Sequence, residues 1–272
     1  MRRTIQERKK THLMELAYTV AGFAVGAIVG LTGVGGGSLM TPLLVLLFGI
    51  HPSVAVGTDL LYASITKTGG TLAHGLKGTV DWQITRRLAT GSLPAAVVTL
   101  LLVGTFAPGG MEGATGLIKV ALGVALVLTA VALIFRKQIQ AYALARFGGT
   151  SNPVRTARLT VLVGAVLGVL VSISSVGAGA LGVTALFFLY PGMPALRIVG
   201  SDIAHAVPLT LVAGIGHWML GSVDWFLLGS LIVGSLPGIW LGTHISTKVP
   251  DRVLRPILAT MLVLVGAKLI SH

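Results

Sequence analysis

The chain has 272 residues, of which 54% are hydrophobic and only 10% are charged, and its mean hydropathy is +0.90. Soluble domains carry roughly 25% charged residues, so the composition excludes an ordinary water-soluble globule and favours a protein that lies in a lipid bilayer. The formal net charge of +12 comes from tails and loops between apolar runs, where basic residues set membrane orientation, so we expect no nucleic acid partner. The absence of cysteine excludes disulfides and thiolate metal sites.

The first apolar run follows a basic N-terminal tail, residues 1–12, as a signal peptide would. It continues into a glycine-rich stretch and shows no A-x-A cleavage pattern, so we interpret it as a retained membrane segment. Further apolar runs follow, most of them near the roughly 20 residues that a spanning helix requires. The runs cover 13–32, 54–75, 88–106, 116–135, 159–175, 196–218, 226–243 and 256–270.

Two shorter apolar runs, Ser38–Ile50 and Leu181–Tyr190, each follow a stretch of small residues and resemble half-helices or re-entrant segments. We therefore expect an all-α polytopic membrane protein with about eight transmembrane helices plus two half-helices. Ten thin crossings are the alternative. A basic linker, residues 136–158, separates a first transmembrane repeat, 13–135, from a second, 159–272.

The two halves repeat each other at a constant offset of 143 residues, which takes Val80-Asp81-Trp82 to Val223-Asp224-Trp225. The same offset pairs other motifs: Gly57-Thr58-Asp59 with Gly200-Ser201-Asp202, His74 with His217, and Gly91-Ser92-Leu93-Pro94 with Gly234-Ser235-Leu236-Pro237. Duplicated halves are typical of secondary transporters. The basic loops favour inverted repeats and the basic tail favours parallel ones, so both arrangements stay open.

The stretch Gly30–Ser38 holds four glycines in five consecutive residues, which makes continuous helix costly at roughly 1 kcal/mol per glycine relative to alanine. An unwound stretch that leads into a helix N-terminus presents N–H groups and a positive dipole, which suit an anion. The counterpart, Ser172–Gly179, keeps small residues and hydroxyls. Close helix packing through small residues is the alternative for both. The candidate substrate-binding residues here are Thr32, Gly35, Gly36, Gly37, Ser38, Ser175, Gly177 and Gly179, with Thr58 and Ser201 from the repeated motif.

Lys67 lies well inside an apolar run. An intramembrane lysine costs on the order of 3 kcal/mol, so its side chain should face the protein interior and be paired. It is either a positive charge that meets a substrate anion or a salt-bridge partner of Asp59 or Asp202. Asp59 and Lys67 are two helical turns apart, so direct pairing within their own helix is not expected.

Asp59 and Asp202 occupy matching positions near the starts of matching segments. Free amides and the helix dipole would satisfy such residues, and proton coupling or ion pairing is the functional interpretation. His205 follows Asp202 by about one turn on the same face. This pair either relays protons or is a hydrogen-bonded part of the core.

Other polar residues have structural explanations. Asp81 and Asp224 are expected to cap the helices that follow them, and His74 and His217 are expected at helix ends as capping or interfacial residues. No nucleophile–base pair, nucleotide-binding loop or H-x-x-x-H spacing occurs. The sequence therefore predicts no enzyme, no cofactor and no metal site.

The series Val29–Pro42 (VGLTGVGGGSLMTP), Ala55–Asp59 (AVGTD), His74 and Gly78–Trp82 (GTVDW), which the second half repeats, resembles the TauE/SafE (sulfite exporter-like) family. The resemblance extends from about residue 14 to about residue 270. It implies a bacterial inner-membrane permease for sulfur-containing or other organic anions, such as sulfite or sulfonates. Many members read Gly-Thr-Ser where this chain has Asp59 and Asp202, so the added carboxylates are candidates for proton coupling.

Together, the residues and the resemblance predict a secondary transporter, either an exporter or an ion-coupled permease, that binds a small anion between the two repeats. A channel-like anion facilitator is the alternative. Protons or sodium are the candidate coupling ions, and a homodimer is the candidate assembly.

Overall fold

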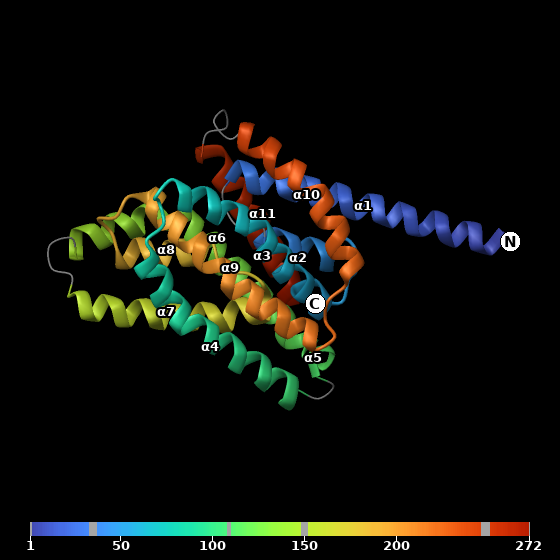
Figure 1. Cartoon of the computed structure of the whole chain (residues 1–272), viewed down its shortest axis with the longest axis horizontal. Coiled ribbons are helices and arrows are strands. Elements are labelled where there is room, and N and C mark those ends of the chain that lie inside the picture. Colours follow the sequence, from blue (N-terminus) through green and yellow to red (C-terminus); the bar gives the residue numbers. More distant parts are fainter. Residues whose placement is uncertain (1, 33–36, 108–109, 148–151, 246–250, 272) are drawn as a thin grey trace.

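The computed structural model describes residues 2–32, 37–107, 110–147, 152–245 and 251–271, and its regular elements there are helices (Figure 1). They are α1 (Arg2–Thr32), α2 (Gly37–Leu46), α3 (Pro52–Leu76), α4 (Trp82–Phe106), α5 (Gly110–Gly113), α6 (Thr115–Phe147), α7 (Pro153–Ser174), α8 (Ala180–Leu189), α9 (Ala195–Met219), α10 (Trp225–Ile245) and α11 (Asp251–Ser271).

Within the described ranges, 6 helices are long and apolar enough to cross a membrane: α1, α4, α6, α7, α9 and α10. α3 is as long as α4 but carries Asp59 and Lys67 in its apolar stretch. The apolar part of α11 is shorter, Leu258–Ser271. The chain is therefore a multi-pass helical membrane protein. Most of the polar stretch 136–158 is helical, because α6 continues to Phe147 and α7 begins at Pro153.

The helix boundaries recur at the sequence offset. α2 and α8, α3 and α9, and α4 and α10 each begin 143 residues apart, and both short helices have 10 residues. Asp81 and Asp224 precede α4 and α10, and each carboxylate accepts the backbone N–H groups two and three residues further on. The predicted N-caps are confirmed, and they explain why equivalent helices begin at equivalent residues.

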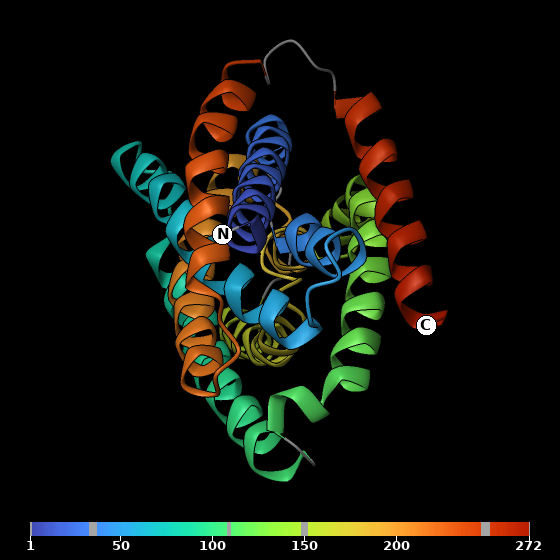
Figure 2. The ribbon, with the colours of Figure 1, turned by 90° about the vertical axis from the view of Figure 1, so that its right-hand side faces the viewer.

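The first helix of each half packs against a helix of the other half, and the two contacts are equivalent. α1 of the first half packs along α10, and α7 of the second half packs along α4. Glycines allow the backbones to approach closely in both pairs: Gly22 lies against Leu231, Gly26 against Ser235, Gly164 against Leu88 and Gly168 against Ser92. The order of these contacts shows that the helices of each pair run parallel. In Figure 2, α10 lies beside α1 on one side of the molecule, and α11 lies beside α6 on the other.

α3 and α9 form the central pair, and they run antiparallel. Gly57 near the start of α3 lies against His217 near the end of α9, and Gly200 near the start of α9 lies against His74 near the end of α3. Both helices belong to the repeated motif, so two equivalent helices cross the protein in opposite directions.

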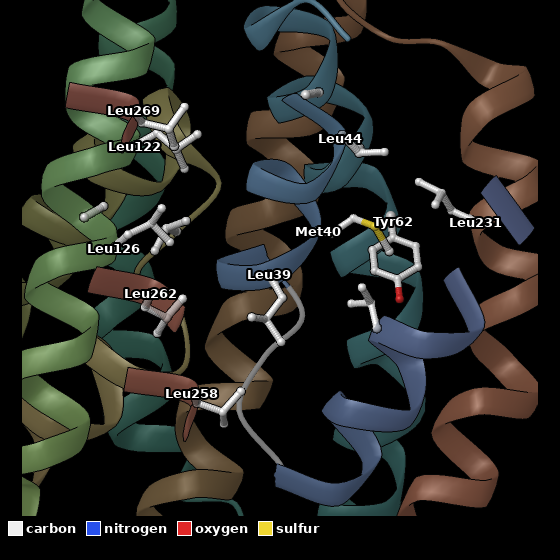
Figure 3. Packing of buried hydrophobic residues seen from close by; sticks show 14 of the residues in the cluster. Leu39, Met40, Leu44, Tyr62, Leu122, Leu126, Leu231, Leu258, Leu262 and Leu269 are labelled. Carbon is white, nitrogen blue, oxygen red and sulfur yellow. The ribbon is translucent and has the colours of Figure 1, made fainter. Parts of the chain in front are cut away.

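The largest apolar cluster fills the space around α2 (Figure 3). Met40 and Leu44 of α2 are fully buried, and Leu39 points toward Leu258 and Leu262 of α11. The ring of Tyr62 on α3 lies close to Met40. A ten-residue helix too short to cross a bilayer is thus held inside the protein by α1, α3, α6 and α11.

The contact between α1 and α10 gives a direct test of the glycine packing. Gly234 lies against the Thr19 carbonyl, whereas Gly229 on the same helix has open space beside it. Gly234→Val should therefore destabilise the protein by about 1–3 kcal/mol more than Gly229→Val, because only the first forces two backbones apart. Thermal unfolding of both variants in detergent measures the difference. Equal melting temperatures would show that these helices do not pack as described.

Candidate functional site

Asp59 joins the two halves of the protein. Its side chain on α3 is 0% exposed, and its Oδ2 accepts hydroxyl hydrogen bonds from Thr41 of α2 and, at 2.9 Å, from Ser175 at the end of α7. Asp59 lies beyond the first turn of α3. Hydroxyls therefore pair with Oδ2 of Asp59, in place of the helix-start amides that the sequence suggested, while Oδ1 has no partner among the described residues.

The turn between α7 and α8 places Ser175 there. Ser175 has a left-handed conformation with φ 59°, and Gly177 and Gly179 have φ values of 130° and 128°. A residue with a side chain rarely adopts these conformations, so the small residues of this stretch serve a sharp chain reversal. The reversal directs the Ser175 hydroxyl to Asp59 and presents the Ala178 carbonyl to Lys67.

Lys67 lies within electrostatic range of two carboxylates, Asp59 and Asp202. Its Nζ donates to the Ala178 carbonyl at 3.0 Å, and it is the cation that acts on both Asp59 and Asp202. The side chain is half-buried, whereas both carboxylates are fully buried. The interior position predicted for Lys67 is confirmed, and the turn before α8 supplies its hydrogen-bond partner.

Asp202 lies against the first turn of α8. Its Oδ1 is so close to Gly182 that an added Cβ there would overlap it, and the Gly179 amide faces the carboxylate. The helix N-terminus that the sequence suggested for a substrate anion thus faces a carboxylate of the protein itself. Neither carboxylate oxygen of Asp202 has a hydrogen-bond partner among the described residues.

His205 of α9 is hydrogen-bonded to Ser92 of α4. Its Nε2 and Ser92 Oγ are 2.8 Å apart, and its Nδ1 has no partner among the described residues. His205 and Asp202 are therefore not hydrogen-bonded to each other, although they are about one turn apart. The equivalent residue in the first half is Tyr62, which approaches Ser235, the equivalent of Ser92.

Thr58 and Ser201 hold the halves together. The Asp224 amide donates to Thr58 Oγ1 at 3.0 Å, and the Asp81 amide donates to Ser201 Oγ at 2.8 Å. The two bonds are equivalent under the 143-residue offset. Both hydroxyls are fully buried, so in this structure they join α3 to the start of α10 and α9 to the start of α4.

The first glycine-rich stretch is only partly described. Gly35 and Gly36 fall outside the described residues, Thr32 ends α1, Gly37 begins α2, and Ser38 is buried in α2. The predicted role of Gly35 and Gly36 in anion binding therefore stays a prediction.

The structure changes the interpretation of His217 and adds Thr41 to the Asp59 site. His217 is fully buried, and its Nε2 donates to the Ser172 carbonyl at 2.8 Å, so it is a core residue and not an interfacial one. Thr41 was missed as a partner of Asp59. The signal was present in the sequence, because Thr41 and Thr184 match at the 143-residue offset.

Comparison with known proteins agrees with this architecture. Residues 18–269 match the family described as Sulfite exporter TauE/SafE. The chain is 41% identical over 258 residues to the probable membrane transporter protein YjnA of Bacillus subtilis, which covers 94% of this chain and 100% of that protein. It is 25% identical to YunE of the same organism, over 92% of this chain and 95% of that protein. It is 23% identical to MJ0441 of Methanocaldococcus jannaschii, over 91% of this chain and 92% of that protein. Both are also named probable membrane transporter proteins. No solved structure gives a significant match.

The Asp59 site can be tested with two equivalent threonines. Thr41 donates to the carboxylate, whereas Thr184 donates only to the Ala180 carbonyl of its own helix, at 2.7 Å. Thr41→Val should destabilise the protein by about 1.5–3 kcal/mol, the range for a hydrogen bond to a charged group. Thr184→Val should have a smaller effect, and thermal unfolding compares the two. An equal loss in both variants would remove the assigned role of Thr41.

Proposed function

The chain belongs to the sulfite exporter TauE/SafE family, and we propose that it is a secondary transporter that carries small organic or sulfur-containing anions, such as sulfite or sulfonates. It acts as an exporter or an ion-coupled permease in a bacterial inner membrane. The anion binds at Lys67, between the two halves.

The position of Lys67 is the observation that carries this proposal. An ammonium group has three donors, and the Ala178 carbonyl accepts from one of them. The side chain keeps exposed surface, so an anion can approach it, whereas the neighbouring carboxylates are enclosed. A half-buried cation in an apolar surrounding attracts an anion far more strongly than a cation in water does.

The helix directions support secondary transport. We infer that the halves are inverted repeats, because the equivalent helices α3 and α9 run antiparallel. In the same structure α1 runs parallel to α10, and α7 runs parallel to α4. A pseudo-twofold axis in the membrane plane would relate such halves. Transporters of this kind place the substrate near the midplane, at the repeat interface and beside broken helices. Lys67, Asp59 and the turn before α8 fit that description.

The basic loops favour one orientation for the inferred repeats, whereas the basic tail at the start of α1 lies at the opposite end of the bundle. Lys77 follows α3, Arg87 lies near the start of α4, Arg155 near the start of α7, and Arg197 near the start of α9. α4 and α7 pack in parallel, so their first turns lie at the same end of the bundle. A pocket at that end is lined by these first turns and by the loop before α9, so all four basic residues lie there. The positive-inside rule assigns that end to the cytoplasm.

A channel-like facilitator is the second candidate, and counterflow distinguishes it. A carrier exchanges labelled anion against an opposing unlabelled gradient, whereas an open pore shows no stimulation from the far side. The buried hydrogen bonds of Asp59 with Thr41 and Ser175 join α2 and α3 to the end of α7. They close the contact between the halves at this point, which supports a carrier and not an open pore.

Lys67 variants test the site. Purified wild-type protein should be stabilised in a thermal-shift screen by at least one anion among sulfite, thiosulfate, taurine, sulfoacetate, sulfate and simple carboxylates, as RT ln(1 + [L]/Kd) requires. Lys67→Met should fold but bind that anion about ten- to a hundredfold more weakly, the equivalent of one charged hydrogen bond. Lys67→Arg should recover part of the affinity, because its planar fork fits differently. Wild-type affinity in Lys67→Met would refute the role.

Single-cysteine labelling tests the inverted repeats in this cysteine-free chain. Lys77 and Leu220 are equivalent residues, each the first after an equivalent helix, α3 and α9. Inverted repeats place them on opposite sides of the membrane, so an impermeant thiol reagent should label Lys77→Cys and Leu220→Cys from different sides. Labelling of both from the same side would establish parallel repeats instead.

A further inference from the structure

Asp59 and Asp202 are equivalent in sequence but have different surroundings. Thr41 and Ser175 donate to Asp59, whereas Thr184, the equivalent of Thr41, donates to the Ala180 carbonyl. Asp202 is 0% exposed, and neither of its oxygens accepts a hydroxyl hydrogen bond in the described part of the chain, whereas in Asp59 only Oδ1 lacks a partner. Burial disfavours the ionised form of a carboxylate in such a place, and protonation removes the charge.

Three groups act on the Asp202 carboxylate: the Lys67 ammonium of α3, the Arg136 guanidinium of α6 and the Gly179 amide just before α8. Lys67 in turn acts on Asp59 of its own helix and on His205, which lies about one turn from Asp202 on α9. Arg136 also lies 4.4 Å from the centre of the Phe187 ring. Lys67 is shared with Asp59, so it neutralises Asp202 only in part. When a substrate anion binds Lys67, the positive charge available to Asp202 decreases further.

We propose that Asp202 is the proton-binding site that couples transport to a proton. This inference rests on the transport function proposed above. A proton from water binds the carboxylate and gives the neutral acid when an anion occupies Lys67, and it leaves when the anion leaves. For a monovalent anion, one negative charge enters and one is neutralised, so the net charge of the buried site is conserved. For a divalent anion such as thiosulfate, the proton compensates one of the two charges.

The surroundings of Asp202 favour a proton over sodium. Sodium is a hard cation that, like other such ions, requires several oxygen ligands. The groups that act on Asp202 are the Lys67 ammonium, the Gly179 amide and the Arg136 guanidinium, which are all donors, and a metal cation beside Lys67 would be repelled. Asp59 differs, because two hydroxyls stabilise its ionised form.

Infrared difference spectroscopy tests the site without any substrate. Full-length protein in detergent is moved from mildly alkaline to mildly acidic pH, and the carbonyl stretch of a protonated buried carboxyl group is recorded. We expect this band in the wild type and its loss in Asp202→Asn. In the control Asp59→Asn the band should remain but appear at a lower pH, because Lys67 then acts on Asp202 alone. If Asp202→Asn does not fold, Asp202→Glu should shift the frequency of the band.

Three results would overturn the assignment. The band could persist unchanged in Asp202→Asn, or in Asp202→Glu where that variant is the one that folds. It could disappear in Asp59→Asn instead. Sodium could suppress it at constant pH, which would make the ligand a metal cation.

Proteoliposomes connect the proton to transport, with thiosulfate as the probe because it stays ionised near neutral pH. In the wild type a pH gradient should drive accumulation of labelled thiosulfate. In Asp202→Asn this accumulation should fall to the level of empty liposomes, while thiosulfate counterflow continues. Gradient-driven accumulation that survives in Asp202→Asn would overturn the coupling role. Absence of thiosulfate flux in the wild type would count against the proposed transport of this anion, and the infrared result would still decide whether Asp202 binds a proton.

Discussion

The antiparallel crossing of α3 and α9 determines where the charges in the membrane interior lie. Thr58 and Ser201 accept the amides that begin α10 and α4, so each helix of the central pair is fixed against the other half. The next residues along the chain are Asp59 and Asp202. Because a hydrogen bond fixes the residue before each aspartate, Thr58 or Ser201, both carboxylates are held in the core. There they must be paired or neutralised.

The rest of the site follows from satisfying these two carboxylates. In the first half the short helix α2 supplies the Thr41 hydroxyl, and the end of α7 supplies Ser175. In the second half the turn before α8 bonds to Lys67, and Asp202 remains without a hydrogen bond among the described residues. The repeat therefore gives a symmetric scaffold, while single residues make the chemistry asymmetric. Lys67 is the clearest case, since its equivalent, Thr210, donates within its own helix.

The sequence was sufficient for the apolar helices, because apolar runs and N-cap aspartates are local signals and the 143-residue offset repeats them. It did not predict that α6 and α7 extend into the basic stretch 136–158. It also identified Asp59, Lys67 and Asp202, because a charge in an apolar run is conspicuous at any position. The contacts were not predictable. Ser175 meets Asp59 only because a left-handed residue turns the chain, and Lys77 and Leu220 lie at opposite ends of an antiparallel pair that charge counting could not orient. Such contacts depend on how distant helices pack.

The asymmetry between equivalent aspartates has a consequence for how a duplicated protein couples two ligands. If both carboxylates were held by hydroxyls, each would stay ionised, and Lys67 would serve only to balance them. If both lacked partners, each would take a proton, and anion binding would not change the protonation of either. In this protein one carboxylate accepts two hydroxyl hydrogen bonds and the other accepts none, and both lie near a single ammonium. This is the arrangement in which occupation of Lys67 changes the charge on one site alone. Linkage of this kind is reciprocal, so a proton on Asp202 must also strengthen anion binding at Lys67.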